Sequence, residues 1–387
     1  MYFRQIGLPD DTSTSFFLWG VRQSGKTTLL KERFPNALFI DLLQAEQFDR
    51  YQREPYRLRQ EILGTTTSRA RQIVIDEVQR LPMILNEVHS LIENEQIAFA
   101  MCSSNARRLR RGGVNLLGGR ALRFRLHGLS AYELGDDFDL ERLLNTGFVP
   151  SIYDSSRWRD YLDAYVYDYL VTEVANEAKL RNLPGFSAFL TSAAISDTEI
   201  VNFVNNASDC GVTSQSVKNY YEILVDAMHG DWLPSFRRRP KRRVTRMPKF
   251  YFSDVGVVNV LARRNQLERE SIGFGQAFES WVFHELQTFN EYRRQREPIT
   301  YWRLSSGSEV DFILGDMKVA IEVKATRRTS TKHFKGLREL AKDHPEVQRR
   351  ILVCSEDTSY VTDDRIEVLS ENDFVKRLWD GEITSKG

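Results

Sequence analysis

Short apolar runs alternate with amphipathic segments along the first part of the chain. Between the runs, apolar residues recur at helical spacing, and strands that are buried on both faces appear as continuous apolar runs. This alternation predicts an α/β domain over residues 1–150, with a parallel sheet and crossover helices. The predicted strands cover residues 16–19, 37–42, 72–76, 97–102 and 121–126.

In the rest of the chain the spacing of apolar residues changes twice, from strand-like to helical and back. From about Arg157 to Asp226 the apolar positions follow helical spacing, and strand-like runs return after Pro248. From Phe274 onward, one helix precedes a further set of apolar runs. This order predicts a helical segment over 151–270 and a smaller mixed α/β domain over 271–387. The predicted strands of that last domain cover residues 299–304, 309–314, 318–323 and 350–354.

The first apolar run leads directly into a glycine-rich loop that fits the pattern G-x-x-x-x-G-K-[ST]. The glycines let backbone N–H groups and the start of the next helix face phosphate oxygens. Lys26 would reach the outer phosphates, and Thr27 would ligate Mg²⁺. The loop therefore predicts ATP binding with Mg²⁺, through Gly20, Val21, Arg22, Gln23, Ser24, Gly25, Lys26, Thr27 and Thr28.

Two carboxylates end the third apolar run. Asp76 would hold the metal ion, and Glu77 would polarise the attacking water. Alone, such a pair is usually a solvated strand end. Because it follows a phosphate loop in the chain, we interpret it as the hydrolytic pair of an Mg²⁺-dependent ATPase.

Further polar residues follow the next strands. One of the short polar side chains of Ser103, Ser104 and Asn105 could hydrogen-bond the γ-phosphate or the attacking water, or these residues could form a turn and helix cap. Arg120 precedes the run ALRFRL, from which a guanidinium could reach the nucleotide of a neighbouring copy in a homo-oligomer. Competing for that role, or for nucleic acid, are Arg107, Arg108, Arg110 and Arg111.

Nine motifs occur in one order along nearly the whole chain. They are GVRQSGKTTLL, VIDEVQRLPMILNEVHSLIE, SSNARRLRRG, GGRALRFRLHGLSAYEL, LLNTGFVPSIYD, PKFYFSDVGVVNVL, GQAFESWVFHEL, YWRLSSGSEVDFIL and AIEVKAT. The combination resembles prokaryotic AAA-type ATPases of the AAA+ superfamily that carry a C-terminal domain of unknown function. The resemblance implies an ATPase core, a winged-helix segment and a PD-(D/E)XK nuclease-like fold. Val21 stands where the family often has proline, and CSSN replaces its usual TGSS or TGSN.

The middle segment carries features of a DNA-binding module. Residues 197–228 fit a helix-turn-helix whose second helix is capped around Thr213 or Ser214. Seven of the ten residues from Arg237 to Arg246 are basic, and a wing of this kind would grip phosphates. The alternatives are a protein-binding surface and a solvated charge run. The predicted DNA contacts are Lys218, Arg237, Arg238, Arg239, Lys241, Arg242 and Arg243.

The C-terminal runs EVDFIL and VAIEVKA carry carboxylates at alternate positions. On a strand, residues two apart share a face, and a turn at Gly315 would bring the two runs together as a hairpin. In restriction-type nucleases such carboxylates hold Mg²⁺ and a lysine steadies the attacking hydroxide, which indicates catalytic roles for Asp311, Glu322 and Lys324. Glu279 would be a further metal ligand, next to Asp311 and Glu322. Such domains can also bind DNA without cutting it.

The amino-acid composition places few restrictions on the partners and location of the protein. Lys and Arg number 54 against 53 Asp and Glu, so any nucleic-acid footprint must come from local clusters. The first residues lack the apolar stretch of a signal peptide, no run of apolar residues is long enough to span a membrane, and no CxxC pair occurs. We therefore expect a cytoplasmic protein. Two functions stay open. One is an ATPase that controls DNA engagement, with or without Mg²⁺-dependent cleavage. The other is a nucleotide-driven switch or regulator, whose winged-helix and nuclease-like parts are non-catalytic scaffolds.

Overall fold

A computed structural model describes most of the chain, and its contacts divide the chain into two compact units. The described residues are 2–9, 13–64, 72–105, 109, 117–175, 178–237, 247–269 and 271–384. The N-terminal unit comprises Phe3–Gly128 and Glu222–His229, and the C-terminal unit comprises Met1–Tyr2, Leu129–Tyr221 and Gly230–Gly387. The predicted boundaries near 150 and 270 stay predictions.

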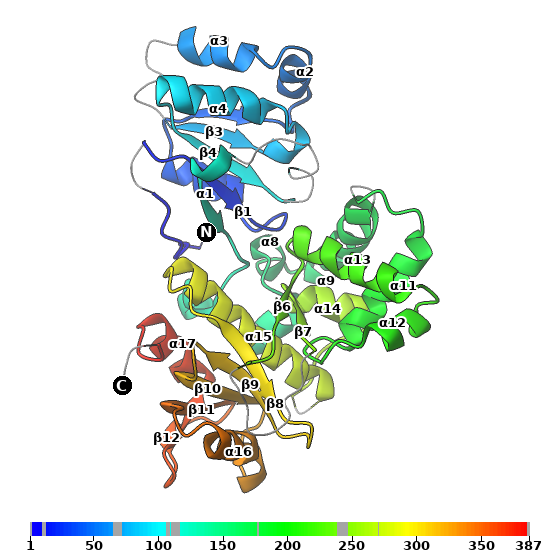
Figure 1. Cartoon of the computed structure of the whole chain (residues 1–387), viewed down its shortest axis with the longest axis vertical. Helices are drawn as coiled ribbons and strands as arrows, with labels where there is room; N and C mark the ends of the chain where they lie inside the picture. The colour runs from blue at the N-terminus through cyan, green and yellow to red at the C-terminus, as the bar shows by residue number, and fades with distance from the viewer. Residues whose placement is uncertain are drawn as a thin grey trace. The chain divides into compact units, whose positions relative to one another are not determined.

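The N-terminal unit is built on a five-stranded parallel sheet in the order β2-β3-β4-β1-β5 (Figure 1). The sheet confirms the predicted α/β class with a parallel-sheet first domain, because every predicted strand is present. The strands are β1 (Phe16–Trp19), β2 (Leu38–Asp41), β3 (Ile73–Asp76), β4 (Phe99–Ser103) and β5 (Leu122–Arg125).

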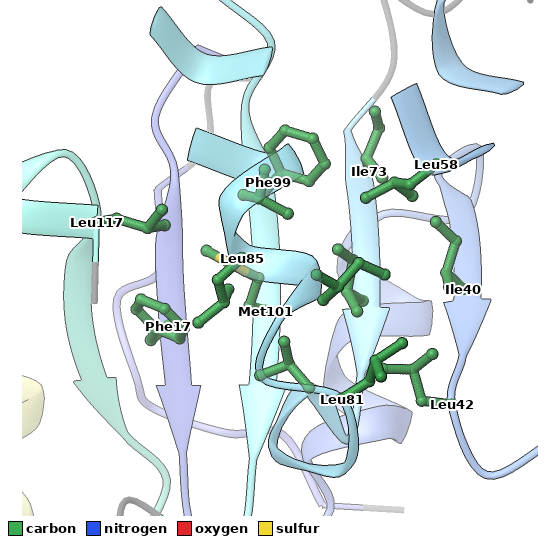
Figure 2. Packing of buried hydrophobic residues seen from close by; sticks show 14 of the residues in the cluster. Phe17, Ile40, Leu42, Leu58, Ile73, Leu81, Leu85, Phe99, Met101 and Leu117 are labelled. Atoms are coloured by element: carbon green, nitrogen blue, oxygen red, sulfur yellow. The ribbon is translucent and has the colours of Figure 1, made fainter. Parts of the chain in front are cut away.

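Helices connect these strands and cover the sheet. Figure 2 shows Leu85 of α4 pointing toward Phe17 and Met101 of neighbouring strands, and all three belong to one buried apolar cluster. The central strands β1, β3 and β4 are almost entirely apolar because both of their faces are buried, whereas the edge strands β2 and β5 are partly exposed. The helical elements are α1 (Lys26–Arg33), α2 (Ala45–Arg53), α3 (Arg57–Gly64), η2 (Val78–Arg80), α4 (Ile84–Glu95) and η3 (Leu117–Gly119).

The middle of the chain is helical, as its period predicts. Its helix-turn-helix starts later than residue 197, because α12 begins at Phe203 with Asn202 as its cap. The elements are α6 (Ala131–Leu134), η4 (Gly135–Asp137), α7 (Leu140–Thr146), α8 (Pro150–Tyr153), α9 (Trp158–Ala164), the π-helical η5 (Tyr165–Val174), α11 (Leu183–Ile195), α12 (Phe203–Asp209), α13 (Ser214–Asp226) and α14 (Val255–Leu261).

A two-stranded antiparallel sheet follows α13. Strand β6 (Gly230–Leu233) pairs with β7 (Lys249–Phe252), so that Leu233 lies opposite Lys249. The sequence predicted strands only after Pro248 and therefore missed β6. Its four residues, GDWL, carry too short an apolar pattern to be distinguished from a turn.

The C-terminal sheet is mixed, as predicted, with the order β12-β13-β11-β10-β9-β8. Strands β8, β9 and β10 are antiparallel neighbours, whereas β10, β11 and β13 run parallel. Strands β12 and β13 were not predicted. The elements are α15 (Ile272–Tyr292), β8 (Ile299–Arg303), β9 (Glu309–Leu314), β10 (Val319–Lys324), η6 (Thr331–Phe334), α16 (Lys335–Asp343), β11 (Arg349–Cys354), β12 (Tyr360–Val361), β13 (Ile366–Ser370) and α17 (Glu371–Trp379).

Helices α15 and α16 both pack against β10 (Figure 1). A glycine fixes the approach of α16, because a Cβ atom on Gly336 would lie 1.9 Å from the carbonyl oxygen of Glu309. The start of α16 therefore passes directly against β9, where the predicted carboxylates lie. Among the described helices, none is long and apolar enough to cross a membrane.

Candidate nucleotide site and acidic cluster

The phosphate loop follows β1 and needs glycine at both glycine positions of its motif. A Cβ atom on Gly20 would lie 2.5 Å from the carbonyl oxygen of Leu126, which is too close for any side chain. Gly25 has a φ of +95° and forms the N-cap of α1. Only glycine takes that backbone conformation without strain, so the loop can direct its N–H groups at a bound anion.

Lys26 points back onto its own loop. Its ammonium donates to the carbonyl oxygens of Gly20, at 2.9 Å, and Val21, at 2.8 Å. Burial lowers the pKa of Lys26, against the opposing attraction of Glu77 and Asp76. The ammonium is therefore held at the loop, where phosphate oxygens can replace the two carbonyl partners.

Thr27 and Asp76 are joined directly. The Thr27 hydroxyl donates to Asp76 Oδ2 at 2.6 Å, and Asp76 Oδ1 accepts from the backbone N–H of Glu77 at 2.9 Å and from the Cys102 thiol. These contacts fix the carboxylate at the end of β3. A hydroxyl and a carboxylate side by side are ligands of the type that Mg²⁺ takes, so the residues fit the predicted ion.

Glu77 is held by Gln79, which was not predicted, and by Ser104, one of the polar residues predicted after β4. Its Oε2 accepts from the side chain of Gln79 and, at 3.4 Å, from the hydroxyl of Ser104. Gln79 also donates to Ser104 at 2.9 Å. Gln79 is buried, and a polar side chain two positions after a hydrolytic glutamate is the one sequence signal that could have found it.

The other nucleotide contacts that were predicted, on the loop and after β4, stay predictions. Asn105 is buried just beyond β4, and its backbone N–H donates to the Ser103 hydroxyl at 3.2 Å. Thr28 is exposed on the first turn of α1. Ser104, rather than Asn105, contacts Glu77, and the choice of phosphate sensor stays open. The contacts expected from Arg22, Gln23 and Ser24 stay predictions in the same way.

Arg120 lies away from the phosphate loop of its own chain. Leu122 pairs with Phe16 at the start of β1, so Arg120 precedes the amino edge of the sheet, whereas the loop follows the carboxyl edge. The Arg120 guanidinium forms an ion pair with Glu93 of α4. A role in trans stays a prediction. Arg107, Arg108, Arg110 and Arg111 lie outside the described residues.

In the C-terminal unit, the hairpin of β9 and β10 brings predicted site residues together. The Lys324 ammonium lies 2.8 Å from Glu322 Oε1 and 3.8 Å from Asp311 Oδ2. Asp311 Oδ2 also accepts from the backbone N–H of Val323 at 2.8 Å. The alternation of the two strands therefore places these three side chains in contact, as expected.

A second lysine, which was not predicted, lies among the same carboxylates. The ammonium of Lys249, on β7, is 2.5 Å from Glu309 Oε1, 3.2 Å from Glu279 Oε1 and 3.9 Å from Asp311 Oδ1. Tyr251 donates to the same Glu279 oxygen at 2.6 Å. We call Glu279, Glu309, Asp311 and Glu322, with Lys249 and Lys324, the acidic cluster.

Burial and mutual charge shift the protonation of this cluster. Burial raises the pKa of Glu279 to about 7, although Lys249 opposes the shift. Burial also raises the pKa of Glu322, and the neighbouring Asp311 adds to it. For Lys249, burial alone would lower the pKa, but attraction to Glu279, Asp311 and Glu309 outweighs it and raises the pKa above its usual value.

The acidic cluster does not fit the predicted metal site as it stands. Within the described ranges, no group of three or more His, Cys, Asp or Glu side chains is placed to hold a metal ion. The Lys249 ammonium lies 3.2 Å from Glu279 Oε1 and 3.9 Å from Asp311 Oδ1, two of the oxygens predicted to hold the ion. Glu322 Oε2 is buried without a hydrogen-bond partner. The metal-binding roles of Glu279, Asp311 and Glu322 stay predictions.

Little of the predicted DNA surface lies within the described residues. Thr213 accepts from the backbone N–H of Ser216 at 3.1 Å, which confirms the predicted cap of α13. Lys218 is exposed on α13, with its ammonium 5.4 Å from the centre of the Phe203 ring. Arg237 is exposed. The other predicted contacts, Arg238, Arg239, Lys241, Arg242 and Arg243, lie outside the described residues.

Three family models match successive parts of the chain. Residues 12–135 match an AAA domain, residues 137–268 match a domain of unknown function, DUF8612, and residues 274–374 match another domain of unknown function, DUF4143. The first match agrees with the phosphate loop and the parallel sheet. It supports a nucleotide-binding ATPase domain of the AAA type in the N-terminal unit.

The individual proteins that match the chain do not assign an activity to it. Uncharacterized proteins of Mycobacterium bovis and Mycobacterium tuberculosis are each 26% identical over 271 residues, which make up 67% of this chain and 59% of the relative. The chain thus spans less than two thirds of the length of these curated relatives. A signal transduction ATPase with a tetratricopeptide repeat sensor from Pyrococcus horikoshii matches at a TM-score of 0.21 and 11% identity, covering 75% of this chain and 48% of that one.

Proposed function

We propose that the protein is an Mg²⁺-dependent ATPase that couples its nucleotide state to the engagement of DNA by its C-terminal unit. The observation that carries the hydrolysis part is the contact of Thr27 with Asp76, at 2.6 Å, beside a Glu77 that is itself held by hydrogen bonds. A loop that only binds nucleotide needs no oriented glutamate at this position.

Each residue of the nucleotide site has a role in this proposal. Lys26 exchanges the carbonyl oxygens of Gly20 and Val21 for phosphate oxygens when ATP binds. Thr27 and Asp76 hold Mg²⁺, which supplies charge stabilisation to the phosphates when it is bound. Glu77 accepts the proton of the attacking water, and Gln79 and Ser104 orient it.

DNA is the proposed partner of the C-terminal unit. The support is the order α12, α13, β6 and β7, in which a capped helix precedes a two-stranded antiparallel sheet, together with exposed Lys218 and Arg237. Seven basic residues between Arg237 and Arg246 would release counterions from DNA and make binding strongly salt-dependent. We assign this winged-helix role to residues 151–270 and a nuclease-like fold to residues 271–387.

Cleavage of DNA is a second candidate. The contacts of Lys324 with Glu322 and Asp311 favour it, because they join the three residues that the nuclease pattern requires. The contacts of Lys249 with Glu279 and Asp311 favour instead a non-catalytic scaffold, in which the unit binds DNA or protein without cutting. Of the two versions, we propose the scaffold.

The site of Arg120 favours a homo-oligomer. Arg120 lies at the opposite edge of the sheet from its own phosphate loop, so it would have to act on the nucleotide of a neighbouring copy. We propose this trans role with Glu93 as the partner that Arg120 leaves when copies assemble. Mixing K26A and R120A chains tests it, because a trans role predicts that activity returns where the intact loop of an R120A chain meets the intact arginine of a K26A chain. A mixture as inactive as its two components would refute the trans role.

One set of assays tests the main proposal. ATP turnover is measured with and without single-stranded, duplex and branched DNA, and the DNA is then examined on gels for binding and for cuts. Lys26→Ala or Glu77→Gln should abolish turnover. Replacing Arg237, Arg238 and Arg239 with Gln should weaken DNA binding, whereas the same change at the exposed Arg293, Arg294 and Arg296 should not. Full turnover in either nucleotide-site variant would refute the ATPase proposal. Unchanged DNA binding in the variant that lacks Arg237, Arg238 and Arg239 would refute the role of these arginines in DNA contact.

A further inference from the structure

Lys249 is a buried cation in the middle of three acidic side chains. The residue is only 3% exposed, and its ammonium lies within 4 Å of Glu279, Glu309 and Asp311. A buried ammonium needs charged or hydrogen-bonding partners, and these are the buried Asp311 and the half-buried Glu279 and Glu309. Glu309 also pairs with Arg303, and Asp311 lies near Lys324, so the lysine depends on this group of carboxylates more than each of them depends on the lysine.

The fold, rather than a flexible side chain alone, sets this position. Lys249 is the first residue of β7, and its backbone pairs with Leu233 of β6 on one side and forms a bridge with Ile200 on the other. The Tyr301 ring also lies under the ammonium, 5.6 Å from ring centre to nitrogen. The backbone is thus held from two directions, and the ammonium is directed at the acidic side chains.

The carboxylates that surround Lys249 are hard oxygen ligands of the kind that bind divalent ions. A cavity of about 920 Å³ is lined by Lys249, Glu279 and Glu309, among other residues, so an ion from solvent can reach the cluster. In addition, Glu322 Oε2 is buried without a hydrogen-bond partner. The acidic cluster therefore contains oxygen ligands, is open to ions from solvent and includes a carboxylate oxygen without a partner. The position between Glu279, Glu309 and Asp311, however, holds the ammonium of Lys249.

We propose that Lys249 is the resident cation of the acidic cluster, and that its ammonium occupies the position in which Glu279, Glu309 and Asp311 would otherwise bind a divalent metal ion. The cluster is then a metal-independent charge network in the native protein and a latent metal site that a single substitution opens. This inference stands without the ATPase or the DNA proposal.

Terbium luminescence tests this assignment on the full chain. Tb³⁺ is a hard cation that takes oxygen ligands, and Tyr251, which donates to Glu279, would sensitise an ion bound there. All variants carry Asp76→Asn, which removes a ligand of the nucleotide site. In this background Lys249→Met should raise saturable luminescence at least about 5-fold, and adding Glu279→Gln and Asp311→Asn should remove the gain. Lys318→Met is the matched control, because it removes a lysine from a surface ion pair with Glu297.

Two results would overturn the proposal. One is saturable luminescence with Lys249 present that disappears on adding Glu279→Gln and Asp311→Asn, because an ion would then bind beside the lysine. The other is a folded Lys249→Met chain, judged by circular dichroism, that shows no gain. Should Lys249→Met fail to fold, the first comparison decides alone, since it needs only chains that retain Lys249. ATP turnover is measured separately, on chains that retain Asp76, so this inference and the proposed function can fail independently.

Discussion

The hydroxyl of Thr27 donates a 2.6 Å hydrogen bond to Asp76 Oδ2, which joins the start of α1 to the end of β3. The two residues are far apart in the chain, and the parallel sheet brings their strand ends to one edge. Asp76 is further fixed by the thiol of Cys102 on β4. The nucleotide site is therefore oriented from three elements of the N-terminal unit.

Glu77→Gln should remove ATP hydrolysis while leaving ATP binding intact. The amide cannot accept the proton of the attacking water, and the loss of a general base should lower kcat by about 100-fold or more. Phosphate release measures turnover, and a fluorescent ATP analogue measures binding. Glu46→Gln, at an exposed position of α2, is the matched control. A Glu77→Gln chain with normal kcat would assign the base to another residue.

Gln79→Leu should lower kcat by about 10-fold with little change in KM, because Gln79 holds Glu77 but lies on no phosphate-binding element. The loss of its donor leaves only the Ser104 hydroxyl on that oxygen. Steady-state kinetics separates the two constants. Gln60→Leu, an exposed change on α3, should leave both unchanged. An equal rise in KM would indicate that Gln79 acts on nucleotide binding instead of on Glu77.

Lys249→Met should destabilise the C-terminal unit by about 3 kcal/mol, because it removes a buried ammonium from the half-buried Glu279. Glu309 keeps its ion pair with Arg303, and Asp311 keeps Lys324. Lys318→Met removes a half-exposed pair and should cost less than about 1 kcal/mol. Urea unfolding followed by tryptophan fluorescence gives both values. Equal losses in the two variants would mean that the contacts of Lys249 contribute no more than a surface ion pair.

Glu285 should make stability fall as pH rises. Its carboxylate accepts from the backbone N–H of Ala131 and from Trp379, but burial raises its pKa from 4.5 to about 7. The folded state therefore binds this proton more tightly than the unfolded state, so the stabilisation is complete below pH 4.5 and is lost as pH rises through 7.

The matched comparison is Glu285→Gln, which has no such proton. The free energy of unfolding of the native chain, relative to this variant, should fall by up to about 3 kcal/mol between pH 4 and pH 8. Urea unfolding of both chains at each pH measures the difference, from which other titrating groups cancel. A difference that does not change with pH would contradict the assigned pKa shift.

Features that are local in the sequence could be predicted. The phosphate loop, Asp76 and Glu77 follow apolar runs directly, and residues two apart on β9 and β10 had to share a face. Those patterns depend only on strand period and on the geometry of a parallel sheet. They therefore yielded the strands of the N-terminal sheet and the contact of Lys324 with Asp311.

Features that depend on contacts between distant segments of the chain could not be predicted. Lys249 lies some sixty residues before Asp311 in the chain, on a strand whose partner β6 has almost no apolar pattern, so nothing local connects it to the carboxylates. Its position required the pairing of β7 with β6.

The most direct test of coupling between nucleotide and DNA is the affinity of the Glu77→Gln chain for a labelled duplex, measured by fluorescence anisotropy with and without ATP and Mg²⁺. This variant should bind ATP without consuming it. The proposal requires ATP to change its DNA affinity by about 10-fold, a coupling within the usual range, while Lys26→Ala shows no effect of ATP. Equal DNA affinity with and without bound ATP in Glu77→Gln would contradict the proposed coupling.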